Sequence, residues 1–168
     1  MTPAIRAETA ADVAAIRALT ACAFRDAGHT SHTEHLIVDA LRGRGRLAVS
    51  LVAELQGILV GHVAISPVSI ADGAVGWYGL GPVSVLPQHQ RRGTGSRLVH
   101  EALRQLRGAG PAGCTVLGDP AFYGRFGFRA IPGLVLPGVP PQYFQALPFG
   151  VSHPQGVVTY DEAFEVRP

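Results

Sequence analysis

The stretch Gln90-Arg91-Arg92-Gly93-Thr94-Gly95-Ser96 separates a β-rich run, residues 77–85, from a helical pattern that extends from Ser96 to about Arg107. Apolar residues of this helical pattern recur on one face. Glycines allow the backbone to approach a ligand closely, and the first amides of a helix are unpaired and carry the positive end of its dipole. We therefore expect residues 90–96, the phosphate loop, to hold a phosphate or pyrophosphate group.

The charge around this loop supports an anionic ligand. Residues 89–107 contain five arginines and a single acidic residue, Glu101. A dinucleotide-binding loop of the Rossmann type is excluded, because it needs a third glycine where Leu98 stands and a parallel βαβ context. The alternative interpretation is a glycine-rich turn with exposed arginines.

The composition excludes several chemistries. All 14 basic residues are arginine. A Walker A loop, a protein kinase and a pyridoxal enzyme each need a lysine, so none of these is possible. The formal net charge of +2 is too small to predict nucleic-acid binding. Hydrophobic residues make up 47% of the chain and charged residues 15%, a composition typical of a globular protein.

The order of elements predicts a mixed α/β (α+β) fold with a central, mostly antiparallel sheet flanked by helices. Gln56-Gly57 is expected to turn a hairpin, and Pro82, which lacks an amide hydrogen, to make its strand irregular. The expected strands are 5–7, 47–55, 58–66, 77–85, 114–117, 128–131 and 156–160. The expected helices are 9–28, 33–42, 96–107 and 121–125.

The length of 168 residues fits one domain, residues 1–168. The most apolar window, residues 47–65, contains Glu54 and His62, which argues against a membrane span. Cys22 and Cys114 are far apart, and the N-terminus has no basic segment before an apolar core, so we expect a reduced, cytoplasmic protein.

Two sets of residues give the chain a family resemblance. Val83-Ser84-Val85-Leu86-Pro87, followed by the phosphate loop, resembles the acetyl-CoA motif of the GNAT N-acetyltransferases, Gln/Arg-x-x-Gly-x-Gly/Ala after a strand. Phe122-Tyr123 with Gly127-Phe128 resembles the tyrosine helix and Gly-Phe turn of that family. The tail, residues 132–168, is similar to that of a small bacterial single-domain subgroup. The resemblance implies the GNAT fold over essentially the whole chain.

The resemblance also implies a cofactor site and a reaction. Acetyl-CoA would be the cosubstrate, transferring its acetyl group directly to an amine. The amide of Val85 is expected to stabilise the oxyanion, and Tyr123 to return a proton to the thiolate, with aromatic packing as the alternative role of Tyr123. Backbone groups of Val83, Ser84 and Val85 would bind the pantetheine arm, and Gln90, Arg91, Arg92, Gly93, Thr94, Gly95 and Ser96 the pyrophosphate.

The general base is not evident, because residues 77–85 contain no carboxylate where many relatives carry a glutamate. Glu34 is the catalytic candidate, with His32, His35 or a water chain as alternatives. The chain departs from the family pattern at Val116, often asparagine, and at Asp119, often alanine. Val116 would remove a contact to pantetheine, and Asp119 is expected to cap a short helix.

The acceptor is left open as a small molecule, an amino acid or a protein amine. Two other functions remain: a CoA-binding sensor without catalysis, and transfer of a longer acyl group. The spacing of His29, His32 and His35 could bind a metal, but no further ligand joins them, so we expect none. We expect no nucleic-acid or membrane partner and a monomer or homodimer. The aromatic residues Trp77, Tyr78, Tyr143 and Phe144 could wall the acceptor pocket or pack in the core.

Overall fold

The computed structural model describes all residues, 1–168. The main sheet has six strands in the order β1-β2-β3-β5-β6-β8, and a second sheet has the order β4-β9-β7. The strands are β1 (Ala4–Ala7), β2 (Val49–Leu55), β3 (Ile58–Pro67), β4 (Ser69–Ile70), β5 (Trp77–Val85), β6 (Gly113–Leu117), β7 (Leu134–Val135), β8 (Phe144–Pro148) and β9 (Gly156–Thr159). The α-helices are α1 (Val13–Phe24), α2 (Glu34–Gly43), α3 (Thr94–Arg107) and α4 (Pro120–Tyr123). The 3-10 turns are η1 (Ala10–Asp12), η2 (Pro87–His89), η3 (Gly124–Phe126), η4 (Pro141–Tyr143) and η5 (Glu162–Glu165).

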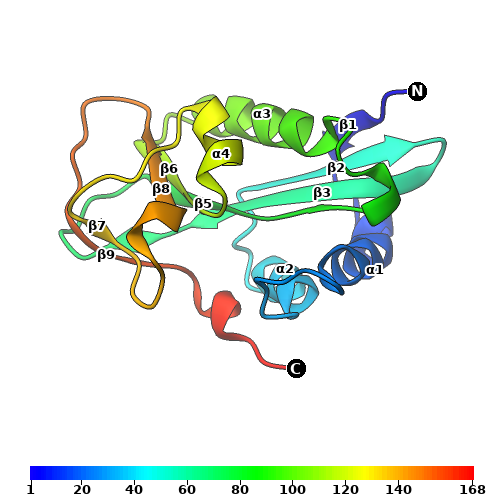
Figure 1. Ribbon diagram of the computed structural model, residues 1–168, viewed down its shortest axis with the longest axis horizontal. Coiled ribbons are helices and arrows are strands. Elements are labelled where there is room, and N and C mark those ends of the chain that lie inside the picture. Colours follow the sequence, from blue (N-terminus) through cyan, green and yellow to red (C-terminus); the bar gives the residue numbers. More distant parts are fainter.

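Helices cover both faces of the main sheet (Figure 1). On one face α3 buries its apolar stripe, including Leu98 and Val99, against β2 and β3. On the other face Ile16 and Leu19 of α1 pack with Val52 of β2. β5 and β6 run parallel, and every other neighbouring pair in this sheet is antiparallel. The expected mixed, mostly antiparallel fold is confirmed.

The β2–β3 hairpin forms as expected. Leu55 pairs with Ile58, and the two residues between them, Gln56 and Gly57, have φ angles of 52° and 79°. Positive φ at both central positions is the conformation of a type I′ turn, whose twist matches that of the flanking strands. Glycine adopts this conformation at no steric cost.

β5 is irregular at Pro82, also as expected. Val83 pairs with Val63 of β3, and Leu80 pairs with Ile65, so two residues of β5 oppose the single residue Ala64. Proline has no amide hydrogen for a sheet ladder, so a bulge is the place in a strand that accommodates it.

β5 and β6 separate after four paired positions. Their parallel register extends from Trp77 opposite Gly113 to Leu80 opposite Val116. Beyond this point β5 continues along β3, and β6 continues along β8. Residues 81–85 therefore have a strand partner on one side only, and we call this opening the fork.

Several expected boundaries are wrong. The first helix ends at Phe24, well before Gly28, and the third begins at Thr94. Residues 128–131 form no strand: Arg129 makes a single bridge to Ala146. The proline- and glycine-rich segment 132–154 contains β7 and β8, which the sequence did not predict. The last expected strand is confirmed as β9, but it belongs to the second sheet.

The C-terminal segment returns to α2 (Figure 1). Asp161 lies 2.8 Å from the Nε atom of Arg44 and 3.2 Å from that of Arg46. Ala163 is buried with Ile37 and Leu41 of α2. These contacts hold the residues that follow β9 against α2, on the α1 and α2 side of the sheet. None of the helices is both long enough and apolar enough to cross a lipid bilayer.

We predict that Gly113→Ala lowers the free energy of unfolding by at least about 2 kcal/mol, because overpacking a filled core forces its neighbours apart. A Cβ atom at this position would lie 2.5 Å from two ring atoms of Trp77 and 2.9 Å from the carbonyl oxygen of Leu147. Urea unfolding measures the change. Gly43→Ala is the control, since nothing lies within 4 Å of its Cβ position. Equal stability of the two variants would contradict the prediction.

Candidate functional site

The backbone of β5 presents peptide groups without a sheet partner to the fork. The amide of Leu86 donates to the carbonyl of Val60 at 2.9 Å. Along an antiparallel pair, the peptide groups of successive residues alternately bond the partner strand and face away from it. The peptide groups of Ser84, two residues before Leu86, therefore also face β3. The peptide groups of Val83 and Val85 consequently point into the fork, where β6 no longer supplies partners.

The phosphate loop ends at the N-terminus of α3. Gly93 is the N-cap, with a φ angle of 83°. The amide of Arg97 makes the first helical bond, to the carbonyl of Gly93 at 3.0 Å, so the amides of Thr94, Gly95 and Ser96 have no helical acceptor. These free donors and the helix dipole favour an anion at this position.

The loop lies directly against β5. A Cβ atom at Gly95 would lie 3.8 Å from a methyl group of Val85 and 3.9 Å from the ring of Phe122. The side chain of Gln90 donates to the carbonyl of Val85 at 3.0 Å. The side chains of Arg91 and Arg92 are exposed. The fold thus brings the expected pyrophosphate residues together with the expected pantetheine strand.

Tyr123 comes from α4 on the β6 side of the fork. Asp119 caps this helix by accepting a hydrogen bond from the amide of Ala121 at 2.9 Å, which confirms the capping role expected for it. The ring of Tyr123 packs against Gly118, which has no side chain to obstruct it, and edge-on against Phe122. Burial raises the pKa of the Tyr123 phenol to about 12, so the hydroxyl keeps its proton at neutral pH and can donate it.

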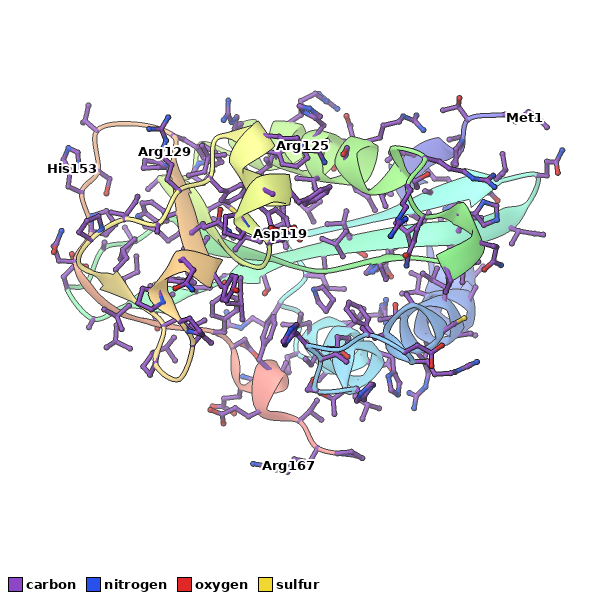
Figure 2. All side chains as sticks on the ribbon, viewed as in Figure 1. Met1, Asp119, Arg125, Arg129, His153 and Arg167 are labelled. Carbon is purple, nitrogen blue, oxygen red and sulfur yellow. The ribbon has the colours of Figure 1, made fainter.

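Arg125 joins the two sides of the fork, a role that the sequence did not reveal. Figure 2 shows Asp119 directly before α4 and Arg125 in η3, on a segment that lies beside α3. The guanidinium of Arg125 donates to the hydroxyl of Ser96 at 3.3 Å and lies 4.8 Å from the centre of the Phe122 ring. The only feature of the sequence that points to this role is the position of Arg125, two residues after Tyr123.

The comparisons with known proteins agree with this geometry. A family model described as an acetyltransferase (GNAT) domain matches residues 46–130. The chain belongs to the GNAT family of acetyltransferases. It is 38% identical over 126 residues to the uncharacterised N-acetyltransferase YhbS of Escherichia coli strain K12, covering 74% of this chain and 72% of YhbS.

Two solved GNAT structures resemble the whole chain. A GNAT acetyltransferase from Brucella melitensis in complex with acetyl-CoA superposes with a TM-score of 0.86 at 50% identity, covering 96% of this chain and 97% of that protein. YhbS from Escherichia coli in complex with CoA gives a TM-score of 0.87 at 33% identity, covering 99% and 93%. The likeness therefore includes the C-terminal tail.

Within this GNAT fold, Glu34 lies at the first turn of α2. One carboxylate oxygen accepts hydrogen bonds from Thr30 and Ser31 of the preceding loop. Its other oxygen is buried without a partner. The catalytic role of Glu34 stays a prediction.

The aromatic residues considered for the acceptor pocket divide into two groups. Trp77 and Phe144 are buried in the cluster between the two sheets, so packing is their role. Tyr78 is half-buried, and Tyr143 is 43% exposed. Val116 is buried in the main core. No group of three or more histidine, cysteine, aspartate or glutamate side chains lies together as a metal site requires.

A polar network lies beneath the fork strand. His62, opposite Ser84, is fully buried, and its Nε2 lies 2.8 Å from the hydroxyl of Ser50. Ser50 donates its proton to Glu8, which also binds Arg42, so His62 must donate from Nε2. Burial, opposed by Glu8 and assisted by Arg42, lowers the pKa of His62 to about 4.

We predict acid destabilisation from this histidine. Between pH 6.5 and 4 the unfolded chain protonates His62 while the folded chain does not, so its contribution to stability, present above pH 6.5, is lost as the pH falls through 4. The full shift corresponds to about 3 kcal/mol. Unfolding of His62→Gln, measured across this pH range, should show a shallower dependence than the wild type.

The exposed His153 provides the matched control for this measurement. His153→Gln is expected to keep the pH dependence of the wild type. An unchanged slope in His62→Gln would show that His62 titrates normally in the folded protein.

Proposed function

We propose that this protein is an N-acetyltransferase that moves the acetyl group of acetyl-CoA directly to an amine. The observation that carries the proposal is the convergence of three parts at the fork: the free amides of the phosphate loop, the peptide groups of Val83 and Val85 that have no sheet partner there, and the phenol of Tyr123. The acetyl-CoA and CoA complexes of the two similar structures support the same ligand for this chain.

The cosubstrate would lie along β5. Its pyrophosphate binds the amides of residues 94–96, with Arg91, Arg92 and Arg125 supplying positive charge. Gly95 adjoins Val85, so the pantetheine arm enters the fork at Val85 and runs back toward Leu80. The peptide groups of Val83 and Val85 hydrogen-bond the arm, whose thioester end lies farther along β5.

The reaction then needs one nucleophilic attack and two proton transfers. The neutral amine attacks the thioester carbon, and a free strand amide of β5 stabilises the oxyanion. The C–S bond breaks as the carbonyl re-forms, and Tyr123 donates its proton to the departing CoA thiolate. The amine loses its proton to Glu34 or to water. The acceptor is a small molecule, an amino acid or a protein amine.

A CoA-binding sensor is the second candidate, and the absence of a carboxylate on β5 favours it. A panel of amines with acetyl-CoA separates the two functions. Binding of CoA without release of free thiol for any amine would contradict the transferase.

We further propose a reducing, cytoplasmic location, based on the free thiols of Cys22 and Cys114.

The phosphate loop is tested by Gly93→Asp. A carboxylate beside the pyrophosphate should weaken acetyl-CoA binding by at least about tenfold, the equivalent of about 1.4 kcal/mol. Isothermal calorimetry measures the affinity. Gly93→Asn is the matched control, because asparagine tolerates positive φ and has nearly the same shape without the charge. Equal affinities of the two variants would argue against a phosphate at this loop.

The acid role is tested by Tyr123→Phe. Removing the proton donor should lower kcat by roughly a hundredfold, since general acids contribute about 10² to 10⁴. The affinity for acetyl-CoA should change little, because the ring remains. Tyr143→Phe, an exposed tyrosine, is expected to keep full activity. A Tyr123→Phe variant with wild-type kcat would leave Tyr123 with packing alone.

A further inference from the structure

Tyr160, in the C-terminal tail, lies over the closed end of the fork. A Cβ atom at Gly79 would lie only 2.6 Å from the Cε2 atom of the Tyr160 ring, so the ring occupies the place that a side chain on β5 would take. Gly79 pairs with Thr115, one position before the last pair of β5 and β6. The tail therefore covers the sheet at the point where the two strands begin to separate.

Hydrogen bonding fixes the ring. The hydroxyl of Tyr160 lies 2.9 Å from that of Thr115, which donates its own proton to the carbonyl of Tyr78 at 3.3 Å. Tyr160 is therefore the donor to Thr115. Burial raises the pKa of Tyr160, which keeps this donor proton in place.

The flanking residues prevent the ring from swinging away. The ring of Phe164 packs edge-on against Tyr160, with centroids 5.0 Å apart. The next residue, Asp161, is held by the ion pairs to Arg44 and Arg46. Tyr160 is thus a fixed wall rather than a mobile lid.

This wall lies on the path of the acyl group if the proposed function holds. The pantetheine arm enters at Val85 and runs toward Leu80, so its acyl end points to the closed end of the fork. There the pairing of Leu80 with Val116 blocks further travel between the strands. An acyl chain that turned over Gly79 instead would meet Tyr160.

We propose that Tyr160 limits the length of the transferred acyl group, so that the fork accepts acetyl and excludes chains of four or more carbons. The proposal rests on the proposed function and selects acetyl-CoA as its donor class. A pocket wall discriminates a single methylene by roughly 10- to 200-fold, so two extra methylenes should be rejected at least as strongly.

The experiment compares the affinities of CoA, acetyl-CoA and butyryl-CoA by calorimetry, which needs no acceptor. The wild type is expected to bind butyryl-CoA at least about tenfold more weakly than acetyl-CoA. Tyr160→Ala should reduce this ratio to near one, whereas Tyr160→Phe, which keeps the ring, should retain it. Tyr143→Ala, a tail tyrosine away from the core, is the matched control.

The outcomes separate the two proposals. Failure of the wild type to bind CoA itself would overturn the proposed function and this inference with it. Normal CoA binding with equal affinities for the two acyl-CoAs would overturn the role of Tyr160 alone, whatever the variants do. An unchanged ratio of the acetyl-CoA and butyryl-CoA affinities in a folded Tyr160→Ala variant would also overturn it. If the alanine variant does not fold, Tyr160→Leu is measured in its place.

Discussion

The short parallel register between β5 and β6 is the constraint on which the candidate site depends. Because the strands pair at only four positions, the peptide groups of Val83 and Val85 have no sheet partner on the fork side. A backbone group without a sheet partner needs another hydrogen-bond partner, and in the proposed function an extended, amide-bearing arm would supply it. The bulge at Pro82 and the phosphate loop lie at opposite ends of the strand segment that such an arm would follow.

Much of this arrangement could be predicted from local sequence. The Gln56-Gly57 turn, the bulge at Pro82 and the Asp119 cap each follow from the conformational preferences of one or two residues, and all are confirmed. The phosphate loop was predicted in the same way, from glycines before an amphipathic stripe. The free amides at the start of α3 agree with a bound phosphate, and the identity of the ligand is part of the proposed function.

The rest depended on contacts between distant residues. β8 lies within a proline- and glycine-rich segment and becomes a strand because β6 offers an open edge, which no local pattern shows. The segment 128–131 is not a strand, because only Arg129 finds a partner. Arg125 and Tyr160 were missed for the same reason: each acts on a residue far away in the sequence, Ser96 and Gly79.

The contact between Arg44 and Asp161 spans 117 residues of sequence. Contacts of such separation form late, because a long loop must close before they contribute. During synthesis, the strands of the fork and the phosphate loop are complete well before the tail emerges. A nascent chain would therefore have an open fork, and the discrimination among thioesters proposed for Tyr160 would be acquired only when residues 156–165 dock on the sheet and α2.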